Sequence, residues 1–91
     1  MASEQRILRF SGNVQGVGFR YTACRAAAGH EVTGYVRNCP DGSVECAVEG
    51  ETLEVEAFVS ELTRRMGQYI RKTTCQKAPA CGHFDGFDVR F

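Results

Sequence analysis

Residues 12–20, GNVQGVGFR, combine three glycines with an arginine that opens the next regular segment. A glycine-rich turn can leave several backbone N–H groups pointing in one direction. The start of a helix adds unpaired N–H donors and the positive end of the helix dipole. Such a segment is suited to bind an anion, and the sequence predicts a phosphate-binding loop here.

The candidate site joins this loop to one residue further along the chain. We expect the phosphate oxygens to be bound by the backbone amides of Gln15, Gly16, Val17, Gly18 and Phe19, and by Arg20. The planar guanidinium of Arg20 can donate two parallel charge-assisted hydrogen bonds. Asn38 offers both a donor and an acceptor, so it can hold a water molecule in one orientation.

The spacing of apolar residues predicts the elements that position these groups. Helical spacing covers 19–28 and 52–66, ended by Gly29 and Gly67, with Thr52 as the N-cap of the second helix. Alternation predicts strands at 6–11, 32–38, 44–49 and 69–76 and a short one at 87–91. Pro79 and two later glycines predict a loop between the last two strands.

This order of elements is that of a ferredoxin-like βαββαβ sandwich. The fold class is α+β, with an antiparallel sheet of four to five strands and two helices on one face. In such a topology the loop after the first strand lies near the end of the second. We therefore expect Arg20 and Asn38 to lie within reach of each other.

The loop residues also restrict the reaction. Between Gly12 and Arg20 there is no histidine, serine or carboxylate, so a covalent triad or a metal-held water is poorly supported. A phosphate site without a strong base suits a leaving group that departs without protonation. A carboxylate, with a pKa of about 4, is such a group, and an acyl phosphate carries it.

Two segments resemble the acylphosphatase family. GNVQGVGFR (12–20) is similar to its phosphate-loop signature, GYVRNCPDGSVECAVEG (34–50) is similar to its second signature, and the closing FDGFDVRF agrees with the family pattern. The resemblance implies hydrolysis of the carboxyl-phosphate bond to a carboxylate and inorganic phosphate, without metal, cofactor or covalent intermediate. It implies that Arg20 binds the phosphoryl group and that Asn38 positions the attacking water.

One segment, 66–81 (MGQYIRKTTCQKAPAC), differs from the Val-rich fourth strand usual in the family. Arg71, Lys72 and two threonines stand where apolar residues are expected. We expect this change to affect strand packing and register rather than Arg20 or Asn38. Charge on an edge strand also discourages edge-to-edge association.

Composition limits the setting in which the chain works. Ninety-one residues fit one domain, 1–91, and eleven basic residues balance eleven acidic ones, which gives no reason to expect nucleic acid or membrane as partner. The N-terminus lacks the apolar core of a signal peptide, and no run of about 18 apolar residues occurs. We expect a cytoplasmic monomer acting on a small-molecule acyl phosphate.

The remaining reactive side chains have no predicted role. The five cysteines, at 24, 39, 46, 75 and 81, form no CxxC pair and are expected to be mostly buried small residues, with one internal disulfide left open. His30 and His83 are expected to be exposed. The phenylalanines at 84, 87 and 91 are expected to pack in the core or at an edge, and the chain end could lie near the site.

Two other functions remain open. A noncatalytic module of the same fold could sense phosphate, whereas RNA binding is disfavoured because the central strands lack paired aromatic residues. The chain could also correspond to the acylphosphatase-like unit that begins larger carbamoyl-transfer maturation proteins. Because it ends at residue 91 without zinc-finger cysteine pairs, we expect a free-standing enzyme.

Overall fold

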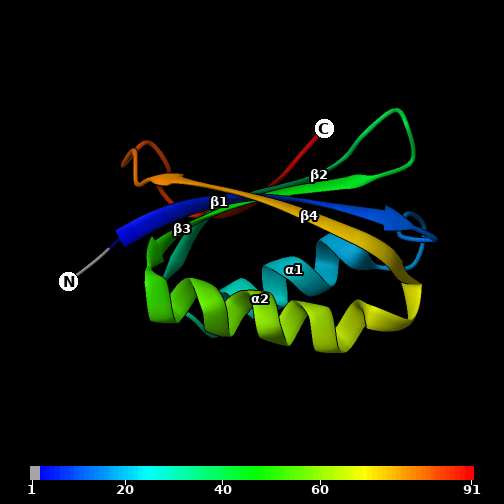
Figure 1. The fold of residues 1–91 in the computed structure, drawn as a ribbon, viewed down its shortest axis with the longest axis horizontal. Coiled ribbons are helices and arrows are strands. Elements are labelled where there is room, and N and C mark those ends of the chain that lie inside the picture. Colours follow the sequence, from blue (N-terminus) through cyan, green and yellow to red (C-terminus); the bar gives the residue numbers. More distant parts are fainter. Residues whose placement is uncertain (1–2) are drawn as a thin grey trace.

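The computed structural model describes residues 3–91, which form a five-stranded sheet with two helices on one face (Figure 1). The strands are β1 (Ser3–Gly12), β2 (Val32–Asn38), β3 (Val44–Glu51), β4 (Ile70–Pro79) and β5 (Phe87–Arg90). The helices are α1 (Phe19–Ala28) and α2 (Thr52–Met66), and a 3-10 turn, η1 (Gly67–Tyr69), follows α2. The strand order is β4-β1-β3-β2-β5.

The pairing of the strands confirms the ferredoxin-like α+β fold. β1 lies between β3 and β4, β3 lies between β1 and β2, and all these pairs are antiparallel. β5 adds to the outer side of β2 as a parallel strand, with Val36 opposite Val89. The two edge strands of the sheet are therefore β4 and β5. The candidate loop follows the end of β1, which is an inner strand.

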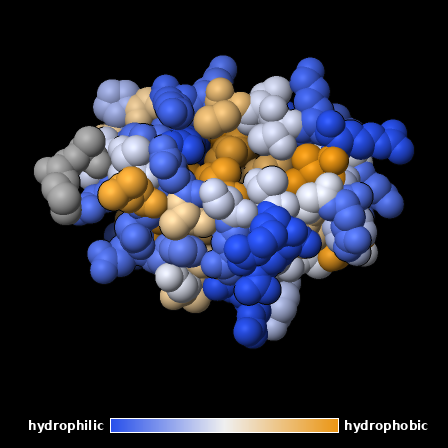
Figure 2. All heavy atoms as spheres, turned by 60° about the horizontal axis from the view of Figure 1, so that its bottom comes forward, coloured by the Kyte–Doolittle hydropathy of each residue, from blue (hydrophilic) through white to orange (hydrophobic). Residues whose placement is uncertain are grey.

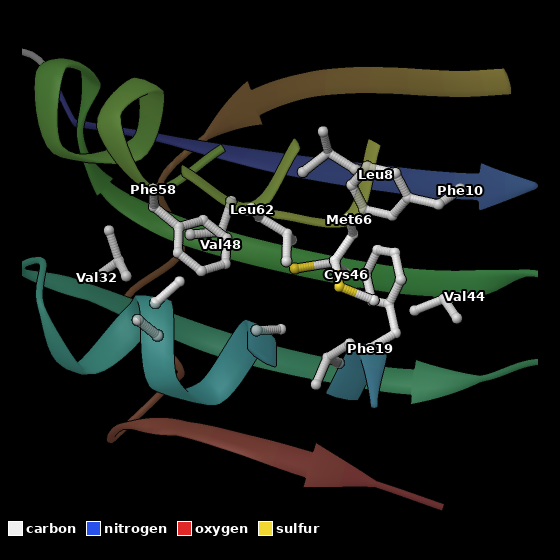
Figure 3. Close-up of a cluster of buried hydrophobic side chains, with 14 of the residues drawn as sticks. Leu8, Phe10, Phe19, Val32, Val44, Cys46, Val48, Phe58, Leu62 and Met66 are labelled. Atoms are coloured by element: carbon white, nitrogen blue, oxygen red, sulfur yellow. The ribbon is translucent and has the colours of Figure 1, made fainter. Parts of the chain in front are cut away.

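A single core fills the space between the helices and the sheet (Figure 3). Alternate strand residues point into it, and the most buried side chains include Phe10, Val36, Val44, Cys46, Val48, Val55, Phe58 and Leu62. Burying one such large apolar side chain contributes about 1.5–3 kcal/mol. From α1 mainly alanines enter the core, which allows this helix to lie close to β2 and β5.

The start of α1 is fixed against the end of β1. The rings of Phe10 and Phe19 lie 5.0 Å apart and tilted, at one end of the core cluster (Figure 3). The N–H of Asn13 donates to the carbonyl of Tyr69 at 2.9 Å, which holds the beginning of the loop to η1. The loop is thus held at both ends by packing and by a backbone hydrogen bond.

The opposite face of the sheet carries a polar network centred on Glu45. Its carboxylate accepts hydrogen bonds from Arg37 at 2.8 Å, Tyr35 at 2.9 Å and Arg9 at 3.2 Å. Burial alone would raise the pKa of Glu45, but the bonds from Arg37 and Tyr35 outweigh it and lower that pKa below its usual value. The face away from the helices is therefore held by charge-assisted hydrogen bonds.

Several predicted boundaries are wrong. β1 begins at Ser3 instead of residue 6, and β3 runs on to Glu51 instead of residue 49, because these two strands pair with each other over the added length. Thr52 is not the N-cap of α2: Glu51 holds that position, and the Thr52 hydroxyl donates instead to the carboxylate of Glu4 at 2.9 Å. The fourth strand runs on to Pro79, because β1 offers a pairing partner along its whole length and a proline is tolerated on an edge strand. Except for Ile70, every residue of β4 is exposed.

Two predictions on side-chain burial are also wrong. Only Cys39 and Cys46 are buried, Cys24 is half-buried, and Cys75 and Cys81 are exposed because they belong to the edge strand and to the loop after it; all five are free thiols. His30 lies 3.0 Å from the carboxylate of Glu61 on α2 and is half-buried.

The surface on the helical side is mostly hydrophilic, and hydrophobic residues reach it only in small groups (Figure 2). The large exposed apolar residues are Tyr21, Leu53 and Phe91. Within residues 3–91, no helix is both long and apolar enough to cross a membrane.

Candidate active site

The loop at 13–18 turns the chain from β1 into α1 with an unusual backbone. Gly16 and Gly18 have φ angles of 78° and 79°, in the left-handed region that favours glycine. Gly18 is the N-cap of α1, no side chain caps the helix, and its first turn contains no acidic residue. The positive end of the helix therefore lacks any negative group from its own sequence.

The backbone donors of the loop are also free. Within residues 3–91, the N–H groups of residues 15–18 donate to no protein acceptor, and the first helical bond runs from Thr22 to the carbonyl of Gly18 at 2.9 Å. Unpaired N–H groups at a helix start favour an anion. The structure therefore has free backbone donors at the position where the sequence predicts an anion-binding loop.

The side chain of Gln15 supports the loop from outside. Its Nε2 donates to the carbonyls of Cys39 and Ser43, each at 2.9 Å. Both carbonyls belong to the connection between β2 and β3, which lies beside the loop at one end of the sheet (Figure 1). One side chain thus ties the loop to the segment that follows Asn38.

A cavity of about 420 Å³ lies between the loop, α1, and the ends of β2 and β5. Its lining residues are Val14, Gly16, Gly18, Phe19, Arg20, Tyr21, Cys24, Asn38, Val89 and Phe91. The cavity therefore brings Arg20 and Asn38 together, although they come from different elements. Of the other predicted residues, Gln15 and Val17 do not line it, and Val17 packs against the core.

Arg20 and Asn38 keep their polar groups unpaired. The ion pairs within residues 3–91 involve Arg6, Arg9, His30, Arg37 and Arg65, and Arg20 takes part in none. The guanidinium carbon of Arg20 lies 5.3 Å from the centre of the Phe91 ring. Within residues 3–91, the side-chain amide of Asn38 forms no hydrogen bond. The Arg20 guanidinium and the Asn38 amide are therefore available to a bound anion and a water.

Four lining residues were not predicted: Val14, Tyr21, Cys24 and Val89. Cys24 could have been found, because it lies four positions after Arg20 and so on the same face of α1. Burial, with a smaller contribution from Asp88, raises the pKa of its thiol. Val89 could not have been found from the sequence, because its position at the cavity depends on the parallel pairing of β5 with β2.

The described residues contain no group of side chains that could hold a metal ion. Within residues 3–91, no three His, Cys, Asp or Glu side chains are grouped as metal ligands. The positive charge at the cavity comes from Arg20 and from the start of α1.

Comparisons with known proteins identify the family of the chain. The sequence model of the acylphosphatase family matches residues 6–89. An acylphosphatase of Methanospirillum hungatei is 43% identical over 75 residues, 80% of this chain and 82% of that protein. An acylphosphatase of Syntrophotalea carbinolica is 38% identical over 85 residues, 92% of each chain.

A solved structure supports the same assignment. The acylphosphatase from Bacillus subtilis superposes with a TM-score of 0.87 at 25% identity, over 97% of this chain and 99% of that one. Together, the family match and these relatives show that the chain belongs to the acylphosphatase family and is an enzyme that hydrolyses acyl phosphates.

Proposed function

We propose that this enzyme cleaves the carboxyl-phosphate bond without a metal ion, that the loop at 15–20 and Arg20 bind the phosphoryl group, and that Asn38 positions the attacking water. The observation that carries the proposal is the shared cavity. Arg20, Asn38 and the loop glycines all line it, and neither Arg20 nor Asn38 has a charged partner in residues 3–91. Free donors and a free cation on one cavity fit a phosphoryl group.

The proposed step is a direct transfer to water. The water oxygen bonds to phosphorus while the bond from phosphorus to the carboxyl oxygen breaks, and the acyl group leaves as a carboxylate. A phosphate oxygen accepts the proton of the water, so inorganic phosphate and a carboxylate are the products. The leaving carboxylate needs no proton, and charge on the phosphoryl oxygens is stabilised by Arg20 and the loop amides.

The wider setting follows from the same properties. The relatives above are matched over 82% or more of their own length, which supports a single acylphosphatase-like domain, 1–91. A net charge of zero gives no reason for nucleic acid or an anionic membrane as partner. We therefore expect a cytoplasmic monomer that needs only its small-molecule substrate and water.

The test is the hydrolysis of benzoyl phosphate with a metal chelator present. Parent, Arg20→Ala and Asn38→Ala proteins are compared after circular dichroism has shown that each is folded. Arg64→Ala is the matched control, because Arg64 is exposed on α2, does not line the cavity and takes part in none of the ion pairs within residues 3–91. We expect chelator-resistant turnover in the parent and the control, reduced about 100-fold or more in both site variants.

Two outcomes would contradict the proposed function. Turnover that the chelator abolishes would contradict the metal-free step. A folded parent that binds inorganic phosphate but does not hydrolyse benzoyl phosphate would be a noncatalytic phosphate sensor.

A further inference from the structure

The cavity is larger than a phosphoryl group requires. About 420 Å³ corresponds to the liquid volume of roughly 14 waters, at about 30 Å³ each. A phosphate has five non-hydrogen atoms and fills only part of this space. The remainder has room for the group attached to the phosphate.

The two parts of the cavity differ in chemistry. At the start of α1 it is lined by the loop glycines, Arg20 and Asn38. One helical turn further, about 5.4 Å along the axis, Cys24 lines it from the same face of α1. Val89 lines it from β5, on the side of the sheet that faces the helices.

Two aromatic side chains complete the second part. Tyr21 and Phe91 both line the cavity and both are exposed, so they lie at its mouth. The Phe91 ring also lies beside the Arg20 guanidinium, which joins the aromatic residues to the polar end. A substrate with its phosphate at Arg20 would thus have apolar and aromatic surface next to its acyl group.

We propose that the part of the cavity formed by Tyr21, Cys24, Val89 and Phe91 binds the acyl group of the substrate and selects acyl phosphates whose acyl group is aromatic or bulky and apolar. This inference rests on the proposed function, because it assumes that the phosphoryl group lies at Arg20. It adds a substrate class, which contacts to phosphate and water alone do not define.

The chemistry of this acyl subsite explains the selection. No Asp, Glu, Lys, Arg or His side chain lines it, and burial keeps the Cys24 thiol neutral by raising its pKa. An apolar acyl group therefore replaces water there without leaving a charge unpaired. Filling a hydrophobic pocket with additional apolar atoms changes affinity by about 10-fold or more.

Binding of two non-hydrolysable phosphonates separates this inference from catalysis. Phenacylphosphonate carries an aromatic acyl group and acetonylphosphonate a methyl one, and both replace the bridging oxygen by a methylene. Calorimetric titration would use the parent, Cys24→Leu, which reduces the free volume, and Cys75→Leu. Cys75 is the matched control because it is exposed on β4 and does not line the cavity.

We expect phenacylphosphonate to bind the parent about 10-fold or more tightly than acetonylphosphonate. Cys24→Leu should reduce this ratio to within about 2-fold, and Cys75→Leu should keep it. If Cys24→Leu does not fold, Val89→Ala, which removes apolar wall and enlarges the cavity, should lower the same ratio several-fold by removing contacts with the aromatic acyl group.

Equal affinities of the two phosphonates for the parent, or a ratio unchanged in Cys24→Leu, would overturn the acyl subsite. Hydrolysis of benzoyl phosphate, measured separately, reports on the proposed function. A preserved phosphonate ratio without hydrolysis would contradict the proposed reaction and still support the subsite.

Discussion

The side-chain Nε2 of Gln15 donates to the backbone carbonyl of Cys39 across 2.9 Å, and the same nitrogen donates to Ser43. This contact joins the loop that precedes α1 to the connection that follows Asn38. The two halves of the candidate site are therefore held at a fixed spacing by a residue whose side chain does not line the cavity.

We expect Gln15→Ala to lower kcat/KM for benzoyl phosphate about 10-fold while the protein stays folded. Both carbonyls keep a second backbone donor, so the free energy of unfolding should fall by only about 1–2 kcal/mol. Steady-state kinetics and urea unfolding measure the two effects. Gln5→Ala is the control, because the Gln5 amide donates to the exposed Cys81 and Gln5 does not line the cavity. An equal loss of activity in this variant would contradict the bracing role.

Arg20→Lys tests whether charge alone is sufficient at the cavity. We expect a folded protein with kcat reduced about 100-fold, because one ammonium cannot reproduce the two parallel bonds of a guanidinium. The measurement is kcat with benzoyl phosphate beside Arg64→Lys, a change of the same kind at an exposed position of α2 that does not line the cavity. Activity close to that of the parent would remove the bidentate role from Arg20.

Acid should weaken the sheet through Glu45. The hydrogen bonds from Arg37 and Tyr35 outweigh burial and lower its pKa in the folded protein, so the folded state binds fewer protons than the unfolded state. This contribution is present above about pH 4.5, the ordinary pKa, and is lost as the pH falls through the folded value. We expect the urea midpoint to be constant near neutrality and to fall in acid.

Glu45→Gln provides the direct test of that linkage. It should reduce the free energy of unfolding at neutral pH by about 1–3 kcal/mol and flatten the acid limb, because the charged acceptor is gone. Glu31→Gln is the control, since the Glu31 side chain is exposed and forms no ion pair in residues 3–91. If the free energy of unfolding falls equally with decreasing pH in the parent and in Glu45→Gln, other carboxylates dominate the acid dependence of stability.

The five free thiols should react in an order set by burial. Iodoacetamide, followed by peptide mass spectrometry, should label Cys75 and Cys81 first and leave Cys39 and Cys46 unlabelled in the folded protein. Burial raises the pKa of Cys46 strongly and that of Cys24 less, so Cys24 should react slowly. All five should react equally in guanidinium, and early labelling of Cys46 would show that the core opens readily.

The sequence predicted the fold because the fold depends largely on local signals, and the predicted Arg20 and Asn38 both line one cavity. Apolar alternation placed β2 and β3, helical spacing placed α1 at its observed bounds, and the glycines placed the loop. The positions of these elements did not depend on contacts between distant parts of the sequence. The bounds of β4 differed because β1 supplies pairing as far as Pro79, and Thr52 lost its capping role to a contact with Glu4.

The cavity residue that the sequence could not predict depends on pairing between distant segments. The predicted donors share one short segment, and Asn38 follows from the topology. Val89 lines the cavity only because β5 pairs in parallel with β2, a partner far away in the sequence. The half-burial of His30 likewise depends on Glu61 of the other helix.

The parallel strand β5 also sets when the cavity can form during synthesis. Val89 and Phe91, which line one wall of it, follow all its other lining residues along the chain and are therefore the last of them to leave the ribosome. Until then β2 has an unpaired edge, and the face of α1 that carries Arg20 and Cys24 lacks its opposite wall. β4 joins β1 almost as late, so pairing between distant segments limits folding. A nascent chain can thus form β2, β3 and both helices, yet the cavity is complete only when β5 has paired with β2.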